Sequence, residues 1–219
     1  CGKYLFYTSK DVQTLRPDKI MRYEIATGMS ENVFHETDDT FTTSVYKTLS
    51  KKWIVISCNS TVSTEYRFLA MDNPTGDFQV FLPRERDHEY FVGDFNGEFF
   101  IQTNYNALNF RLMKGKIGQV KEDWEEVIPH REETLLEDFL LYNDFMVLQE
   151  RTNGLTQLRV IDQKNGEDHY INFGEPTYTA YLGLNLDRSS NILRFGYTSL
   201  TTPSSVIDYN MSTKTKDVK

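Results

Sequence analysis

The feature that most constrains this chain is an internal repeat. Four short apolar or alternating runs, separated by turns rich in Gly, Asn, Asp and Pro, recur about every 45 residues. Alternating apolar and polar residues indicate β-strands, and the turn residues between them indicate antiparallel hairpins. A four-stranded antiparallel unit repeated at this period is typical of β-propellers. We therefore predict an all-β fold: a partial β-propeller with four complete four-stranded blades plus half a blade.

The predicted blade boundaries follow the turns. Half a blade comes first, four complete blades follow, and a polar tail that we expect to fray ends the chain: residues 1–30, 31–76, 77–119, 120–166, 167–211 and 212–219. Asn96-Gly97 is a strong hairpin signal because both residues tolerate a positive φ. Because the first residues already resemble an interior strand, we expect the chain to be a piece of a larger propeller. Its exposed strand edges would then favour self-association.

Composition and charge exclude several classes of partner. Lys and Arg total 24 against 32 Asp and Glu, a formal net charge of −8, and no basic stripe indicates nucleic-acid binding. No apolar run approaches the roughly 20 residues of a membrane helix. The two cysteines, Cys1 and Cys58, form neither a disulfide framework nor a metal-ligand pattern. We expect no nucleic-acid or membrane partner and a cytoplasmic location, with a periplasmic one left open.

The sequence offers no catalytic constellation. It contains no Gly-x-Ser-x-Gly elbow to carry a serine nucleophile. Its four histidines lie at strand ends or in turns beside acidic residues, and we interpret them as solvated loop residues: His35, His88, His130 and His169. No second histidine follows His88-Glu89 at zinc-peptidase spacing. We therefore predict no catalytic residue, no cofactor and no metal in this chain.

Paired acidic residues give little support to a glycosidase. Such an enzyme needs two carboxylates held a defined distance apart across a sugar. Asp38-Asp39 and Glu125-Glu126 are adjacent pairs, and adjacent strand residues point to opposite faces of a sheet. We interpret both pairs as exposed acids.

Equivalent connectors of the predicted blades are the best candidates for a functional surface. We assign them to the links between the third and fourth strands of each unit, which open on one face of a propeller. Their polar residues would contact a partner domain or a substrate, or else only cap strand ends: Asn59, Thr64, Asn104, Asn109 and Arg151.

Several segments, taken in order, carry a family resemblance. They are residues 16–20 (RPDKI), 63–68 (STEYRF), 77–90 (DFQVFLPRERDHEY), 103–110 (TNYNALNF) and 197–206 (YTSLTTPSSV). With these segments, nearly the whole chain resembles the propeller of the oligopeptidase B (protease II) branch of the prolyl oligopeptidase family of serine peptidases.

The resemblance implies a fold and a role. Members of this family pair a closed propeller with an α/β-hydrolase domain, and the oligopeptidase B branch cleaves short peptides after Arg or Lys. The chain would then be the non-catalytic propeller segment that gates access to the active site. Its partners would be peptide substrate and a catalytic domain that would follow Lys219. Two alternatives remain: a stand-alone propeller that binds peptides or proteins, and, more weakly, a propeller glycosidase.

Overall fold

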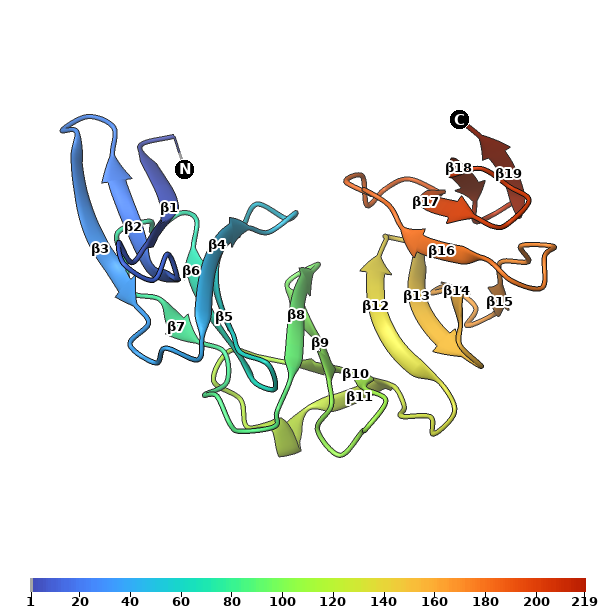
Figure 1. Ribbon diagram of the computed structural model, residues 1–219, viewed down its shortest axis with the longest axis horizontal. Helices are drawn as coiled ribbons and strands as arrows, with labels where there is room; N and C mark the ends of the chain where they lie inside the picture. The colour runs from blue at the N-terminus through green and yellow to red at the C-terminus, as the bar shows by residue number, and fades with distance from the viewer. Residues whose placement is uncertain (1) are drawn as a thin grey trace. The chain divides into compact units, whose positions relative to one another are not determined.

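The computed structural model describes residues 2–219 and confirms an all-β protein (Figure 1). The described strands form five antiparallel sheets, one with three strands and four with four strands. Within each sheet, neighbouring strands follow one another along the chain, as in propeller blades. The strands divide between two compact units. The first contains the chain up to Asn106 and Arg111–Pro129, and the second contains Ala107–Phe110 and His130–Lys219.

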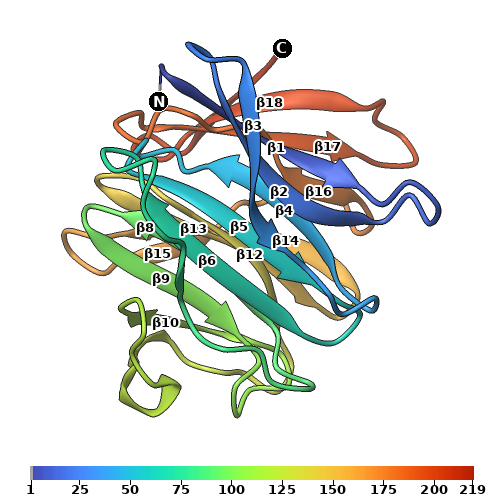
Figure 2. The ribbon, with the colours of Figure 1, turned by 90° about the vertical axis from the view of Figure 1, so that its left-hand side faces the viewer.

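The first unit holds three sheets. The first sheet contains β1 (Tyr4–Lys10), β2 (Pro17–Glu24) and β3 (Met29–His35). The second contains β4 (Thr42–Lys47), β5 (Trp53–Asn59), β6 (Thr64–Ala70) and β7 (Gln79–Val80). The third contains β8 (Tyr90–Phe95), β9 (Glu98–Thr103), β10 (Arg111–Gly115) and β11 (Glu125–Ile128), with a 3-10 turn at Lys121–Asp123. Figure 2 shows the twist of β4, β5 and β6 from the side.

The second unit holds two sheets. One contains β12 (Leu135–Leu141), β13 (Phe145–Thr152), β14 (Leu155–Asp162) and β15 (Asp168–Tyr170). The other contains β16 (Thr179–Leu182), β17 (Ile192–Thr198), β18 (Ser205–Asn210) and β19 (Thr215–Val218). Asn143 and Asp144 lie in the short connector between β12, which ends at Leu141, and β13, which begins at Phe145.

Each unit has its own apolar core between packed sheets. In the first unit, Phe68, Phe81 and Phe99 meet edge to face or tilted, with ring centroids 5.0 to 5.6 Å apart. In the second unit, buried Val147 and Leu158 pack in one cluster with Phe195 of the neighbouring sheet. Aromatic and β-branched side chains fill the space between twisted sheets well, which explains their abundance in the strand runs.

The predicted hairpin turn is confirmed. Asn96 and Gly97 connect β8 to β9 with φ values of 50° and 86°. Asn153 and Gly154 connect β13 to β14 in the same way, at 51° and 79°. These left-handed pairs match the twist of the flanking strands and hold the hairpins in register.

The strands are grouped differently from the prediction. Each run that we expected to open a blade instead pairs with the strand before it and completes that sheet, as β3, β7, β11 and β15 do. The reason lies in the turns. Residues 72–76 and 164–166 looked like blade boundaries, but they join the third strand of a sheet to its fourth. A glycine-rich turn has the same sequence signature in both settings.

The expected fraying of the polar tail is also wrong. Residues 215–218 form β19, which pairs antiparallel with β18 from Ile207 to Asn210. A turn at residues 211–214 brings the strand back, and the amide of Lys214 donates to the Asn210 carbonyl at 2.8 Å. Polarity did not signal disorder here because an outer strand contacts solvent on most of its surface.

Candidate functional site

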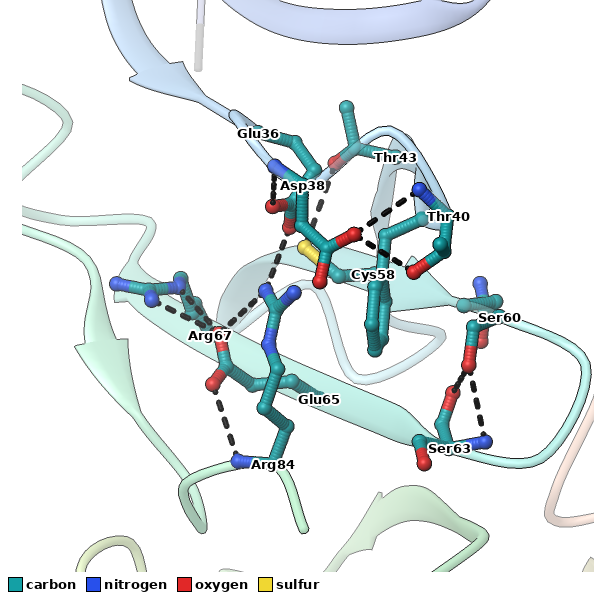
Figure 3. Close-up of polar contacts among 12 residues, drawn as sticks. Glu36, Asp38, Thr40, Thr43, Cys58, Ser60, Ser63, Glu65, Arg67 and Arg84 are labelled. Atoms are coloured by element: carbon teal, nitrogen blue, oxygen red, sulfur yellow. Dashed lines mark hydrogen bonds and ion pairs between the residues drawn. The ribbon is translucent and has the colours of Figure 1, made fainter. Parts of the chain in front are cut away.

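A cavity lies at one end of the second sheet. In a meander, the connector between the second and third strands opens at the same end as the connectors that enter and leave the sheet. Those three segments line a cavity of about 420 Å³ through residues 38–41, 60–63 and 84–86. Figure 3 shows the polar contacts around Arg84, with the lining residues Asp38, Thr40, Ser60 and Ser63 among the side chains drawn.

Arg84 organises the base of this site. Its Nη2 donates to Glu36 Oε2 at 2.5 Å and to Glu65 Oε1 at 3.4 Å. Its guanidinium carbon lies 3.9 Å from the centre of the Phe41 ring. Glu65 also accepts from Arg67 Nε at 2.9 Å. Two arginines therefore balance two buried carboxylates.

Electrostatic interactions keep Glu36 and Arg84 ionised. Burial alone would raise the pKa of Glu36, but hydrogen bonds from Arg84 and from the Asp38 amide hold that pKa below its ordinary value. Burial alone would lower the pKa of Arg84, yet Glu36 and Glu65 raise it above its ordinary value. A paired carboxylate with a lowered pKa is a poor proton acceptor. The cluster thus suits recognition or positioning better than acid–base catalysis.

The strand register explains why these side chains meet. Thr43, Cys58 and Glu65 are direct partners across β4, β5 and β6, so they share one face of the sheet. Cys58 Sγ lies 3.7 Å from Thr43 Oγ1, and burial raises the pKa of the thiol to about 12. That thiol is unreactive at neutral pH.

Two of the predicted residues flank the cavity segment 60–63. Asn59 ends β5 and donates to Ser57 Oγ at 3.4 Å. The Thr64 hydroxyl donates to the Tyr90 carbonyl and accepts from the Tyr90 amide, both at 2.8 Å. Thr64 therefore fastens β6 to β8. Whether either residue also contacts a partner stays a prediction.

The other three predicted residues brace connectors elsewhere. Asn104 accepts from the Glu89 amide at 2.9 Å, and Asn109 donates to the Glu132 carbonyl at 2.5 Å. Arg151 pairs with Glu137 at 2.5 Å. The structure gives all three a part in holding a connector or a strand, and a contact with substrate or a partner domain stays a prediction.

The prediction of solvated loop histidines is wrong for His88. This side chain is 5% exposed, and its Nε2 lies 2.9 Å from Thr103 Oγ1. Its ring stacks on Tyr90 with centroids 5.3 Å apart. Burial lowers the His88 pKa to about 4, so the ring is neutral at physiological pH. The connector 81–89 places His88 against Thr103 of β9 and the Tyr90 ring of β8, and sequence position alone did not indicate these contacts.

Sequence reasoning missed Glu36, Glu65 and Arg84. A weak signal was present, because Glu65 and Arg67 stand two apart in an otherwise apolar run and so share one strand face. A charge at a core-facing position implies a partner. The partner itself could not be named, since Arg84 is 48 residues from Glu36 along the chain.

A second arginine cluster lies in the second unit. Glu150 on β13 is fully buried, with 0% exposure, and pairs with Arg131. The Tyr170 hydroxyl donates to the other Glu150 oxygen at 2.9 Å and accepts from Arg131 at 3.2 Å. Arg159 approaches the same carboxylate to 4.0 Å and pairs with Asp168.

Two kinds of feature are absent from residues 2–219. No group of His, Cys, Asp and Glu side chains there is arranged to hold a metal ion. The same residues contain no helix with the length and apolarity needed to span a membrane.

Comparison with known proteins identifies the class that this architecture represents. The family model described as the prolyl oligopeptidase N-terminal β-propeller domain matches residues 1–219. The chain belongs to that family.

Two curated relatives match along almost the whole chain. Dipeptidyl aminopeptidase BI of Pseudoxanthomonas mexicana is 35% identical over 218 residues, which cover 98% of this chain and 30% of the relative. Protease 2 of Moraxella lacunata is 30% identical over 218 residues, which cover 99% of this chain and 31% of the relative. The chain thus spans about 30% of the length of these relatives.

Solved structures share the fold. Oligopeptidase B from Trypanosoma brucei, in a closed form with covalently bound antipain, superposes with a TM-score of 0.89 at 22% identity. The match covers 100% of this chain and 32% of that one. Oligopeptidase B from Leishmania major gives 0.84 at 24% identity, over 99% of this chain and 32% of that one. The resemblance noted in the sequence is thereby confirmed.

Proposed function

We propose that this chain is the non-catalytic propeller segment of a serine oligopeptidase that hydrolyses short peptides. The observation that carries the proposal is the family match over residues 1–219, together with a fold shared with oligopeptidase B structures. The sequence has no Gly-x-Ser-x-Gly elbow, so the nucleophile would come from a separate catalytic domain. Alone, the 219-residue chain should be inactive.

The propeller would act as a gate. Its sheets pack on dense apolar cores, which resist deformation, so a polypeptide that reaches an active site beside them would have to be short and flexible. Relatives give this idea support. The Trypanosoma brucei enzyme was captured in a closed form. For two prolyl endopeptidases of the same fold, inter-domain dynamics are given a role in catalysis and specificity. Opening and closing between domains would then admit substrate.

Two substrate preferences are supported by different relatives. The family resemblance implies cleavage after Arg or Lys within short peptides, and the likeness to Protease 2 and to oligopeptidase B structures supports that branch of the family. The 35% identity to a dipeptidyl aminopeptidase favours release of dipeptides from the amino terminus. We propose the first as the main activity and the second as its competitor.

One assay distinguishes cleavage after Arg or Lys from the release of dipeptides. The complete peptidase that carries this propeller is incubated with a peptide blocked at its amino terminus and containing one internal Arg, and with the same peptide unblocked. Mass spectrometry then identifies the products. Cleavage after Arg in both peptides supports the main proposal. Dipeptide release from the unblocked peptide alone supports the competitor.

Two further outcomes concern the propeller itself. Hydrolysis by the 219-residue chain without a catalytic domain would contradict its non-catalytic role. A complete protein that hydrolyses neither peptide would contradict the peptidase proposal and favour a propeller that only binds peptides or proteins.

A further inference from the structure

The outer strand of the first sheet is long compared with its counterparts. β3 has seven residues and stands at the end of the order β1-β2-β3, so its outer edge faces no strand of residues 2–219 (Figure 1). The outer strands of the other four sheets have only two to four residues: β7, β11, β15 and β19. A long unpaired edge is a template for pairing with another strand. Among these outer edges, β3 is therefore the one most open to association.

Brevity and charge do not protect β3. Its sequence, MSENVFH, contains no Lys, Arg or Pro, and residues 29–32 are exposed. The carboxylate of Glu31 accepts from Arg22 Nε at 2.7 Å, so an arginine of the same sheet balances its charge. Val33 and Phe34 belong to the residue types that favour strands. Another feature must keep a second strand away from this edge.

A β-bulge interrupts the strand at Val33. The pairing of β3 with β2 shifts there by one residue, so Val33 has no partner between Asn32 and Phe34. Successive residues of a regular strand point to opposite faces, yet Val33 and Phe34 both pack against the apolar cluster that contains Ile20. The Arg67 guanidinium carbon lies 4.8 Å from the centre of the Phe34 ring. Packing therefore holds the bulge in place.

The side chain of Asn32 occupies a backbone donor at this bulge. Asn32 Oδ1 accepts from the Phe34 amide at 3.0 Å. Each residue has one amide donor, and an amide that donates within its own strand is not free to donate to an incoming one. Asn32 itself is exposed, so core packing does not account for this contact. Its effect is to remove a donor from a strand that is otherwise open.

We propose that the Asn32–Phe34 hydrogen bond is an autoinhibitory contact that keeps β3 from pairing antiparallel with β3 of a second copy of this chain. Two identical strands pair antiparallel about a two-fold axis, so each copy presents the same edge and lacks the same donor. The inference concerns self-association and does not depend on peptidase activity. The expectation that open edges favour self-association then does not extend to β3.

Sedimentation equilibrium of the complete protein that carries this propeller tests the contact. Asn32→Val removes the acceptor. Ser30→Val is the matched control, because Ser30 is also exposed and lies two residues away on the same face of the same strand. It receives the same apolar, β-branched side chain but leaves the Asn32 acceptor in place. Asn32→Asp keeps an acceptor oxygen at position 32 and should behave like the wild type.

We expect Asn32→Val to dimerise at least about tenfold more tightly than Ser30→Val, because one amide in each copy becomes available for a hydrogen bond. The wild type and Asn32→Asp should remain monomeric over the same concentrations. Equal association of the two valine variants would show that apolarity alone is responsible and would overturn the proposal. So would a monomeric Asn32→Val variant, or a wild type that already dimerises through β3.

Hydrogen–deuterium exchange locates the contact. In Asn32→Val, deuterium uptake by residues 29–35 should fall several-fold as the protein concentration rises, since pairing covers this edge. Association with unchanged uptake there would place the contact elsewhere and contradict the proposal. Circular dichroism checks that the variant is folded. If it is not, Asn32→Ala removes the same acceptor with a smaller change, and the same outcomes apply to it.

Discussion

Two arginine clusters, one in each unit, handle buried charge in different ways. Arg84 takes two carboxylates from two different segments, stacks on Phe41 and lines an open cavity. Arg131 instead shares a single fully buried carboxylate, Glu150, with the hydroxyl of Tyr170. In each case the arginine comes from a connector that links two sheets. An arginine from a connector, paired with a buried carboxylate, can therefore either shape a surface cavity or fasten a strand in a sheet of this type.

Among the substitutions that test this comparison, Arg131→Met should cause the largest loss of stability. The substitution removes the main cation from a carboxylate that has 0% exposure, and an uncompensated buried charge costs about 3 to 5 kcal/mol. We expect the midpoint of urea unfolding, followed by circular dichroism, to fall accordingly. Arg131→Lys should recover part of the loss. An unchanged midpoint in Arg131→Met would mean that Tyr170 and Arg159 suffice to balance Glu150.

A pH titration contrasts the two units through their histidines. His88 in the first unit has its pKa lowered by burial from 6.5 to about 4, so the folded state favours the neutral ring. Because the unfolded state binds this proton more readily than the folded state, His88 does not reduce the free energy of unfolding above pH 6.5. As the pH falls from 6.5 toward 4, the free energy of unfolding drops by about 3 kcal/mol in total. His88→Gln should flatten the fall in the free energy of unfolding over that range.

His169 in the second unit provides the control for this titration. Burial lowers its pKa as well, but its Nε2 meets the Tyr209 hydroxyl at 2.7 Å and the side chain is only half-buried. We expect His169→Gln to change the pH dependence less than His88→Gln. The opposite order would show that burial of His88 is not the dominant cause.

Arg84→Met should have the smallest effect of the three. Glu65 keeps Arg67 as a partner, and Glu36 keeps the Asp38 amide, so a loss of about 2 kcal/mol is expected for the charged hydrogen bonds removed. Tryptophan fluorescence is a suitable probe because Trp53 and Trp124 both lie in the first unit. If Arg84→Met lowered the free energy of unfolding more than Arg131→Met does, the expected ranking of the two clusters would be wrong.

Much of the fold could be predicted because its signals are local. Alternation identified strands, and Asn96-Gly97 identified a hairpin through the conformations that those two residues allow. The grouping into sheets could not be predicted, since turns at residues 72–76 and 164–166 have the same composition whether they join strands or blades. Only hydrogen bonding between β6 and β7, or β14 and β15, separates the two cases.

The site was less predictable because its contacts are long-range. Asparagines in connectors are visible in a sequence, and so Asn104 and Asn109 could be selected, although both brace backbone. Glu36 and Arg84 meet across 48 residues, and no local pattern joins them.

The short outer strands have a consequence for solubility. β7 has two residues and β15 has three, whereas the inner strands beside them have seven and eight. A foreign strand that approached either edge would find too few backbone groups to extend a ladder, so amyloid-like growth has little to build on there. The brevity of β7 and β15 protects these two edges in a protein whose interior is rich in aromatic, β-forming sequence.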